Sequence, residues 1–200
     1  MARGKAERAV LAADEAAAEA ALPYQGSVAM EALGRFASLG DQPPLRILCA
    51  ATIAVGLFGG DRRLARTGLR MLAAHTLATF AKDFVKNRVD RTRPRSKSGA
   101  GKDHVPRSGR DTSKEETSFP SGHSAGAAAV ACAFARDYPE HSAPALAAGG
   151  ALARAQIPRC AHYPTDVGAG LAIGIAAEAV VDIALRLVEE RSGTERPTGA

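Results

Sequence analysis

The residues of this 200-residue chain that could do chemistry gather in three short segments, 86–94, 120–123 and 154–166. Each segment lies where an apolar stretch meets a polar one, so each is expected at a helix end. Their candidate side chains are Lys86, Arg93, Ser121, Gly122, His123, Arg154, His162 and Asp166. Together these cations, histidines and the single carboxylate are suited to binding and transferring an anionic group.

The cations of these segments favour a phosphate. Lys86 supplies a point charge, whereas Arg93 and Arg154 offer planar forks for bidentate contacts to oxyanions. Ser121 and Gly122 are expected at a helix N-terminus, where free backbone N–H groups attract an anion. Gly122 also lets the backbone approach the ligand closely.

Two histidines could supply the groups for phosphoryl transfer, one as a nucleophile and the other as a general acid. Asp166 follows His162 by four residues. It is expected to accept a hydrogen bond from one imidazole nitrogen of His162, which leaves the other nitrogen free to attack. The remaining histidines lack such a context and are expected to be structural: His75, His104 and His141.

The order of these motifs resembles the type 2 phosphatidic acid phosphatase superfamily over roughly residues 64–188. The motifs are Lys86-x6-Arg93-Pro94, then Pro120-Ser121-Gly122-His123, then Arg154 with His162-x3-Asp166. That superfamily includes lipid phosphate phosphatases, bacterial acid phosphatases and vanadium haloperoxidases. The resemblance implies a helical bundle and hydrolysis of phosphate without a metal or any other cofactor.

The resemblance also implies a role for each candidate residue. His162 would be the nucleophile that forms a phosphohistidine, Asp166 would orient it, and His123 would protonate the leaving group. The residues expected to hold the phosphoryl oxygens are Lys86, Arg93, Arg154, Ser121 and Gly122.

The third motif departs from the family pattern. The family usually places its arginine six residues before the histidine, and this position holds Gln156. Arg154 lies eight residues before His162, and Arg159 lies three residues before it. We expect Arg154 to be the ligand, because it ends a helix as the family arginine does, and we keep Arg159 as the alternative.

The composition favours a helical scaffold to position these segments. Hydrophobic residues make up 46% of the chain and aromatic residues only 4%. This excludes a disordered chain, three scattered cysteines exclude a disulfide scaffold, and the abundance of alanine disfavours an all-β fold. We therefore expect an all-α fold, a bundle of about five to six helices with the active site at helix ends on one face. The resemblance implies that this bundle is embedded in a membrane.

The chain divides into three expected parts. Residues 1–42 form an N-terminal polar or amphipathic helical segment, 43–188 the phosphatase bundle and 189–200 a polar tail. The helices expected around the motifs are 64–86, 122–136, 145–155 and 165–188, with a long polar loop at 88–118. Because alternate loops of an up-down bundle share a face, the loops at 88–118 and 157–164 should meet.

Hydropathy alone does not decide between a soluble and a membrane bundle. The charge-free runs 47–60 and 141–153 contain 14 and 13 residues, fewer than the roughly 18 of a spanning helix. The resemblance implies a multi-pass protein of the cell membrane. Its expected partner is an anionic lipid phosphate, of the phosphatidic acid, phosphatidylglycerol phosphate or polyprenyl pyrophosphate type, and not a nucleic acid. The sequence does not define an oligomeric state.

Three alternatives remain open at this point. A soluble acid phosphatase or a vanadium-dependent haloperoxidase of the same superfamily would use the same residues. A non-enzymatic membrane protein would instead bind anionic lipid through the basic segment 88–114, in keeping with the net charge of +5. The basic residues of that segment outside the motif are Arg88, Arg91, Arg95, Lys97, Lys102, Arg107, Arg110 and Lys114.

Overall fold

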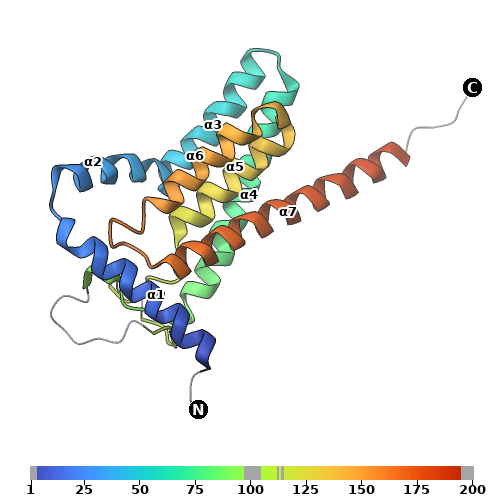
Figure 1. Cartoon of the computed structure of the whole chain (residues 1–200). Helices are drawn as coiled ribbons and strands as arrows, with labels where there is room; N and C mark the ends of the chain where they lie inside the picture. The colour runs from blue at the N-terminus through green and yellow to red at the C-terminus, as the bar shows by residue number, and fades with distance from the viewer. Residues whose placement is uncertain (1–3, 97–104, 112, 114, 195–200) are drawn as a thin grey trace, which may run out of the picture.

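The structure, a computed structural model, describes residues 4–96, 105–111, 113 and 115–194. These residues form seven α-helices and one two-stranded antiparallel ribbon (Figure 1). The helices are α1 (Lys5–Ala21), α2 (Val28–Ala37), α3 (Gln42–Phe58), α4 (Arg62–Lys86), α5 (Gly122–Asp137), α6 (Ser142–Arg154) and α7 (Pro164–Thr194). The strands are β1 (Val89–Asp90) and β2 (Arg107–Ser108). The predicted all-α fold is confirmed.

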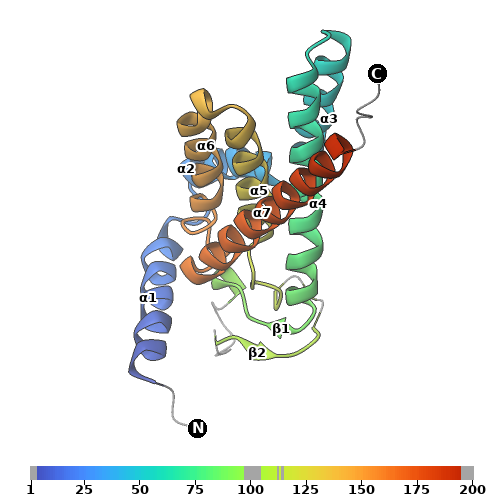
Figure 2. The same ribbon diagram turned by 90° about the vertical axis from the view of Figure 1, so that its right-hand side faces the viewer.

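Helix α5 lies at the centre of the bundle and contacts α4, α6 and α7. Its buried face consists of small residues, among them Ala125 and Ala129. Figure 2 shows α7 crossing this face diagonally. The crossing is close: a Cβ atom at Gly170 would lie 2.4 Å from the Ser121 carbonyl oxygen, and one at Gly174 would lie 2.3 Å from that of Ala125. The two helix N-termini are therefore held side by side.

The alternating helix directions bring the predicted segments to one end of the bundle. Helices α4 and α6 end there, and α3, α5 and α7 begin there. The backbone N–H of Ser121 at the start of α5 donates to the Asp166 carbonyl oxygen in the first turn of α7, at 3.0 Å. The second and third motifs are thus joined directly.

The observed elements differ from the predicted ones in two places. The polar segment 88–118 contains the ribbon of β1 and β2, which Asp90 secures by accepting a hydrogen bond from the Asp111 N–H at 2.9 Å. Helix α7 continues past residue 188 to Thr194. Among the predicted loop and histidine residues, Lys97, Lys102, His104 and Lys114 lie outside the described residues.

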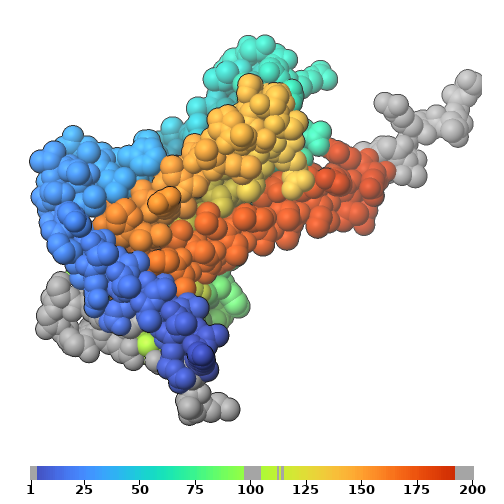
Figure 3. All heavy atoms as spheres, in the orientation of Figure 1, coloured from blue at the N-terminus to red at the C-terminus, as the bar shows by residue number. Residues whose placement is uncertain are grey.

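The N-terminal segment packs onto the bundle. Figure 3 shows α1 lying against the first turns of α7. Asp14 and Ala18, four residues apart and therefore on one face of α1, are buried by this contact. The buried aspartate is unusual for a helix whose other residues, apart from Ala18, are exposed or half-buried, and its partners lie beneath the site described below.

Among the described residues, no helix carries an apolar stretch long enough to cross a membrane. Many large apolar side chains are nevertheless exposed on the outer faces of α3, α4 and α7. They include Ile47, Val55, Leu57, Phe58, Leu69, Phe80, Phe84, Ile175, Val180, Ile183 and Val188.

Candidate active site

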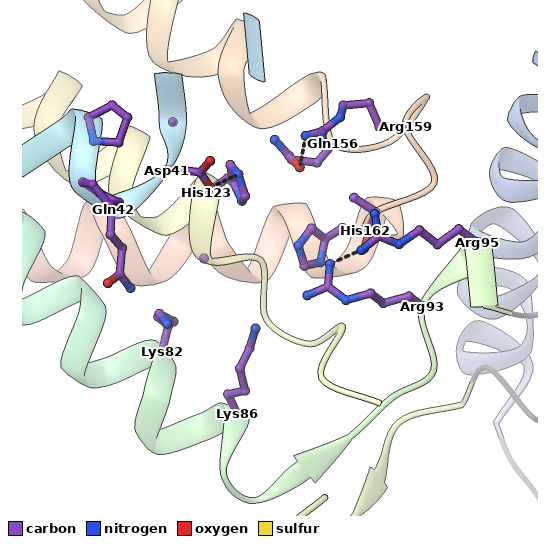
Figure 4. A pocket seen from close by; sticks show the side chains of 15 residues that line it. Asp41, Gln42, Lys82, Lys86, Arg93, Arg95, His123, Gln156, Arg159 and His162 are labelled. Atoms are coloured by element: carbon purple, nitrogen blue, oxygen red, sulfur yellow. Dashed lines mark hydrogen bonds and ion pairs between the residues drawn. The ribbon is translucent and has the colours of Figure 1, made fainter. Parts of the chain in front are cut away.

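A pocket of about 620 Å³ opens where the three motifs meet (Figure 4). It is lined by five of the eight residues singled out from the sequence: Lys86, Arg93, Gly122, His123 and His162. The other polar side chains that line the pocket are Asp41, Gln42, Lys82, Arg95, Gln156 and Arg159. The catalytic roles of the eight residues stay predictions, but five of them share one cavity.

The imidazole ring of His162 is oriented by a hydrogen bond at one of its two nitrogens. Its Nδ1 lies 2.7 Å from the carbonyl oxygen of Ser118, which can only accept a hydrogen bond, so Nδ1 carries the proton and Nε2 the lone pair. The ring is almost fully buried. Burial lowers the pKa of His162 to about 4, and the nearby Arg93 and Lys86 charges act in the same direction. The imidazole is therefore neutral at physiological pH, which is the state that a nucleophile requires.

Asp166 does not take the hydrogen bond predicted for it. Its Oδ2 lies 3.7 Å from Nδ1 of His162, farther than the Ser118 carbonyl oxygen. The carboxylate instead accepts hydrogen bonds from the Ser118 hydroxyl at 2.5 Å and from the Tyr163 N–H at 2.9 Å. It thus fixes the segment whose carbonyl orients the histidine. Burial opposes its charge, but the neighbouring His162, Arg91 and Ser118 hold the pKa of Asp166 below its ordinary value.

Arg91 lies on the side of Asp166 away from His162 and was not predicted as a site residue. Its fully buried guanidinium donates to Asp166 Oδ1 at 2.6 Å and to Asp14 Oδ2 at 2.7 Å. It also lies over the Tyr163 ring, 4.2 Å from the centroid. A continuous chain of contacts therefore runs from α1 through Arg91 and Asp166 to the segment that holds His162.

The cations of the pocket are crowded together. Burial and the Arg93 and Lys82 charges lower the pKa of Lys86 to about 8. Burial and the Arg95 charge lower the pKa of Arg93 to about 10. Lys82 lies one helical turn before Lys86. A Cβ atom at Gly122 would lie 3.5 Å from Cε of Lys82. Because each cation disfavours the charge of its neighbours, an anion bound among them would relieve this repulsion.

His123 is paired with a carboxylate that the sequence reasoning missed. Its Nε2 lies 2.6 Å from Oδ1 of Asp41, the residue that precedes α3. Burial lowers the pKa of His123, Asp41 raises it, and the surrounding Arg159, Arg93 and Lys86 lower it. Asp41 is therefore the group that favours the charged imidazolium.

The structure does not bring Arg154 into the pocket. Ala153, its neighbour at the end of α6, is buried, so the phase of the helix turns Arg154 to the exposed side. Arg159 lines the pocket instead, and its Nη1 donates to Gln156 Oε1 at 3.3 Å. The alternative left open from the sequence is the one that the geometry favours.

Ser121 is buried beside the pocket and is absent from its lining. Its Oγ accepts hydrogen bonds from the N–H of Ser124 at 3.3 Å and from the Ser124 hydroxyl at 2.8 Å. This is an N-cap for α5, and the residues of that terminus that line the pocket are Gly122 and His123. Of the other histidines, His75 is buried in the bundle and His141 is exposed at its far end.

Comparisons with known proteins found one similar solved structure and one matching family model. The chain is similar in fold to a solved structure described as the first transmembrane PAP2 type phosphatidylglycerolphosphate phosphatase from Bacillus subtilis. The TM-score is 0.64 at 23% identity, over 90% of this chain and 88% of that one. A comparison with curated proteins found no match. The sequence model of the PAP2 superfamily matches residues 67–186, more than half of the chain and all three motifs. The chain therefore belongs to the PAP2 superfamily.

Proposed function

We propose that this protein is a metal-independent phosphatase that hydrolyses a phosphomonoester or pyrophosphate on a lipid, through a phosphohistidine on His162. Membership of the PAP2 superfamily supports a phosphatase activity. The observation that carries the proposal is a neutral, oriented His162 in a pocket that also contains five cations and the second histidine, His123.

The first step transfers the phosphoryl group to the protein. Lys86, Arg93 and Arg159 bind the phosphoryl oxygens and neutralise the charge that they carry in the transition state. The lone pair of His162 Nε2 forms the P–N bond as the P–O bond to the leaving group breaks. The electron pair of that bond stays on the leaving oxygen, which takes a proton from His123.

The second step releases phosphate. His123, now neutral, accepts a proton from a water molecule as the water oxygen attacks the phosphorus. The P–N bond breaks, its electron pair returns to Nε2, and inorganic phosphate leaves. Both histidines are then in their starting protonation states, so the cycle balances without an added base.

A lipid substrate is supported by two features of the molecule and by its relative. The phosphate pocket lies at the end of a bundle whose α3, α4 and α7 expose large apolar side chains, such as Phe58 and Phe80. The similar Bacillus subtilis protein is described as acting on phosphatidylglycerolphosphate. We extend the proposal to a protein of the cell membrane, with an anionic lipid phosphate as its substrate.

The test is phosphate release by the detergent-purified protein in the presence of EDTA. The substrates are phosphatidic acid, phosphatidylglycerol phosphate, a polyprenyl pyrophosphate and the soluble ester p-nitrophenyl phosphate. We expect EDTA-resistant release that is lost in His162→Ala and retained in His141→Ala, whose side chain is exposed far from the pocket. Release that needs an added metal, or that survives in His162→Ala, would contradict the proposal.

A further inference from the structure

We propose that Asp41 is a positioning residue for the leaving-group acid His123 and directs the enzyme towards phosphomonoesters whose leaving group is an alcohol, and away from diphosphates. This inference rests on the proposed phosphatase function and deepens it by naming the substrate class. Asp41 lies outside residues 67–186, the part of the chain that the superfamily model matches.

The contact between the two side chains defines which nitrogen can act. Asp41 Oδ1 lies 2.6 Å from His123 Nε2, so Nε2 carries a proton and points to the carboxylate. A Cβ atom at Gly40 would lie 3.6 Å from Cδ2 of His123, which places that edge of the ring against the backbone before α3. Nδ1 lies on the opposite edge. It is therefore the nitrogen available to donate a proton to a leaving oxygen.

The surroundings of His123 make this carboxylate necessary. The other charged or titratable groups that line the same pocket are Lys82, Lys86, Arg93, Arg95, Arg159 and His162. All of them are cationic or neutral, and burial also disfavours the imidazolium. Among the described lining residues, Asp41 is the only carboxylate. It is thus the one protein group here that favours a protonated acid before the substrate binds.

The same charge discriminates between leaving groups. An alkoxide is a poor leaving group and depends on protonation by His123, whereas a phosphate leaves readily without it. A carboxylate bound to the acid also repels a second phosphate placed at the leaving-group position. Both effects favour hydrolysis of an alkyl phosphomonoester over that of a diphosphate.

The experiment compares three substrates in detergent-purified full-length protein: a short-chain phosphatidic acid, farnesyl diphosphate and p-nitrophenyl phosphate. The variant is Asp41→Asn, and Asp41→Glu tests whether a restored charge rescues it. The matched control is Asp61→Asn, which removes the same charge from the residue that caps α4, where the Asp61 carboxylate accepts from the Leu64 N–H at 2.9 Å. Hydrolysis of p-nitrophenyl phosphate needs little acid assistance and reports whether each variant is folded.

We expect Asp41→Asn to lower kcat for the phosphatidic acid about tenfold, and to change kcat for p-nitrophenyl phosphate less than about twofold. The ratio of kcat/KM for farnesyl diphosphate to that for the phosphatidic acid should rise about tenfold. The alkaline limb of the kcat profile with the phosphatidic acid should move to lower pH, because His123 loses the group that raises its pKa. Asp41→Glu should recover part of each change, and Asp61→Asn should show none.

Two results would overturn the inference while leaving the phosphatase intact. One is an equal fall on all three substrates in Asp41→Asn, which would show a purely structural role. The other is a wild-type preference for the diphosphate that Asp41→Asn does not alter. If the wild-type protein releases no phosphate from any of the three substrates, the proposed function itself fails and the inference falls with it.

Discussion

The contact of α1 with Arg91 and Asp166 gives a prediction that covers stability and activity together. Asp14 is buried, accepts from Arg91 Nη2 at 2.7 Å, and accepts from the Thr165 N–H at 3.0 Å. The substitution Asp14→Asn keeps the shape and one acceptor oxygen but removes the charge. Arg91 then remains fully buried with Asp166 as its charged partner.

The size of the effect follows from this geometry. A charged hydrogen bond is worth about 1.5–3 kcal/mol, and a buried ion that loses its whole partner costs about 3–5 kcal/mol. Because Arg91 keeps Asp166, we expect a loss near the lower figure, about 2 kcal/mol. For a domain of this size that corresponds to a fall of about 4–8 °C in Tm. We also expect kcat to fall about tenfold, since Arg91 loses one of the two anchors that align Asp166 and His162.

Thermal unfolding and kcat with p-nitrophenyl phosphate, both in the same detergent, measure these two effects. The kinetic assay is run well below the lower Tm, so that unfolding does not contribute. Glu19→Gln on the exposed side of α1 is the matched control, because it removes the same charge from the same helix. If Asp14→Asn matches Glu19→Gln in both quantities, α1 does not support the site and the reasoning fails.

Two further predictions concern the pocket itself. Arg159→Met should lower kcat/KM about a hundredfold, as expected for the loss of one donor to a developing oxyanion. Arg154→Met should change kcat/KM less than about twofold, because Arg154 is exposed outside the pocket. The reverse order of effects would support Arg154, the residue assigned from the sequence. The pKa of His162 is lowered from 6.5 to about 4, so between these values the unfolded chain binds a proton that the folded protein does not. Stability should therefore fall as pH decreases from 6.5 to 4, and the fall should be smaller in His162→Asn; equal falls measured by thermal unfolding would contradict the lowered pKa.

The sequence could predict the parts of the site that are set by local spacing. Lys86, His123 and His162 lie at helix ends, and an up-down bundle brings those ends to one face whatever the details of packing. Arg154 was assigned by the same kind of argument, because it ends α6. The side chain of Arg154 nevertheless points away from the pocket. The direction of a side chain at a helix end depends on where the helix begins and ends, and the sequence defines those boundaries only to within about one or two residues.

Contacts between distant segments were beyond this kind of reasoning. Asp14 and Thr165 are 151 residues apart, and Asp14 stands among other acidic residues of an alanine-rich helix. Asp14 differs from the other acidic residues of α1 in being buried, on the same helix face as Ala18. This burial arises only when α1 packs onto the bundle. The sequence around Asp41 likewise predicts only a helix start, because an aspartate shortly before two prolines is typical of that position.

Both carboxylates come from the N-terminal segment, outside residues 67–186, and each serves one of the two histidines. Asp14 acts on the His162 side through Arg91 and Asp166, and Asp41 contacts His123 directly. The matched region supplies the cations and histidines that we propose bind and transfer a phosphoryl group. Among the described residues that line the pocket, the one carboxylate is Asp41, which comes from the N-terminal segment. Phosphoryl transfer should therefore be common to chains that share the matched region, while the preferred leaving group should follow the residue that the N-terminal segment places against His123.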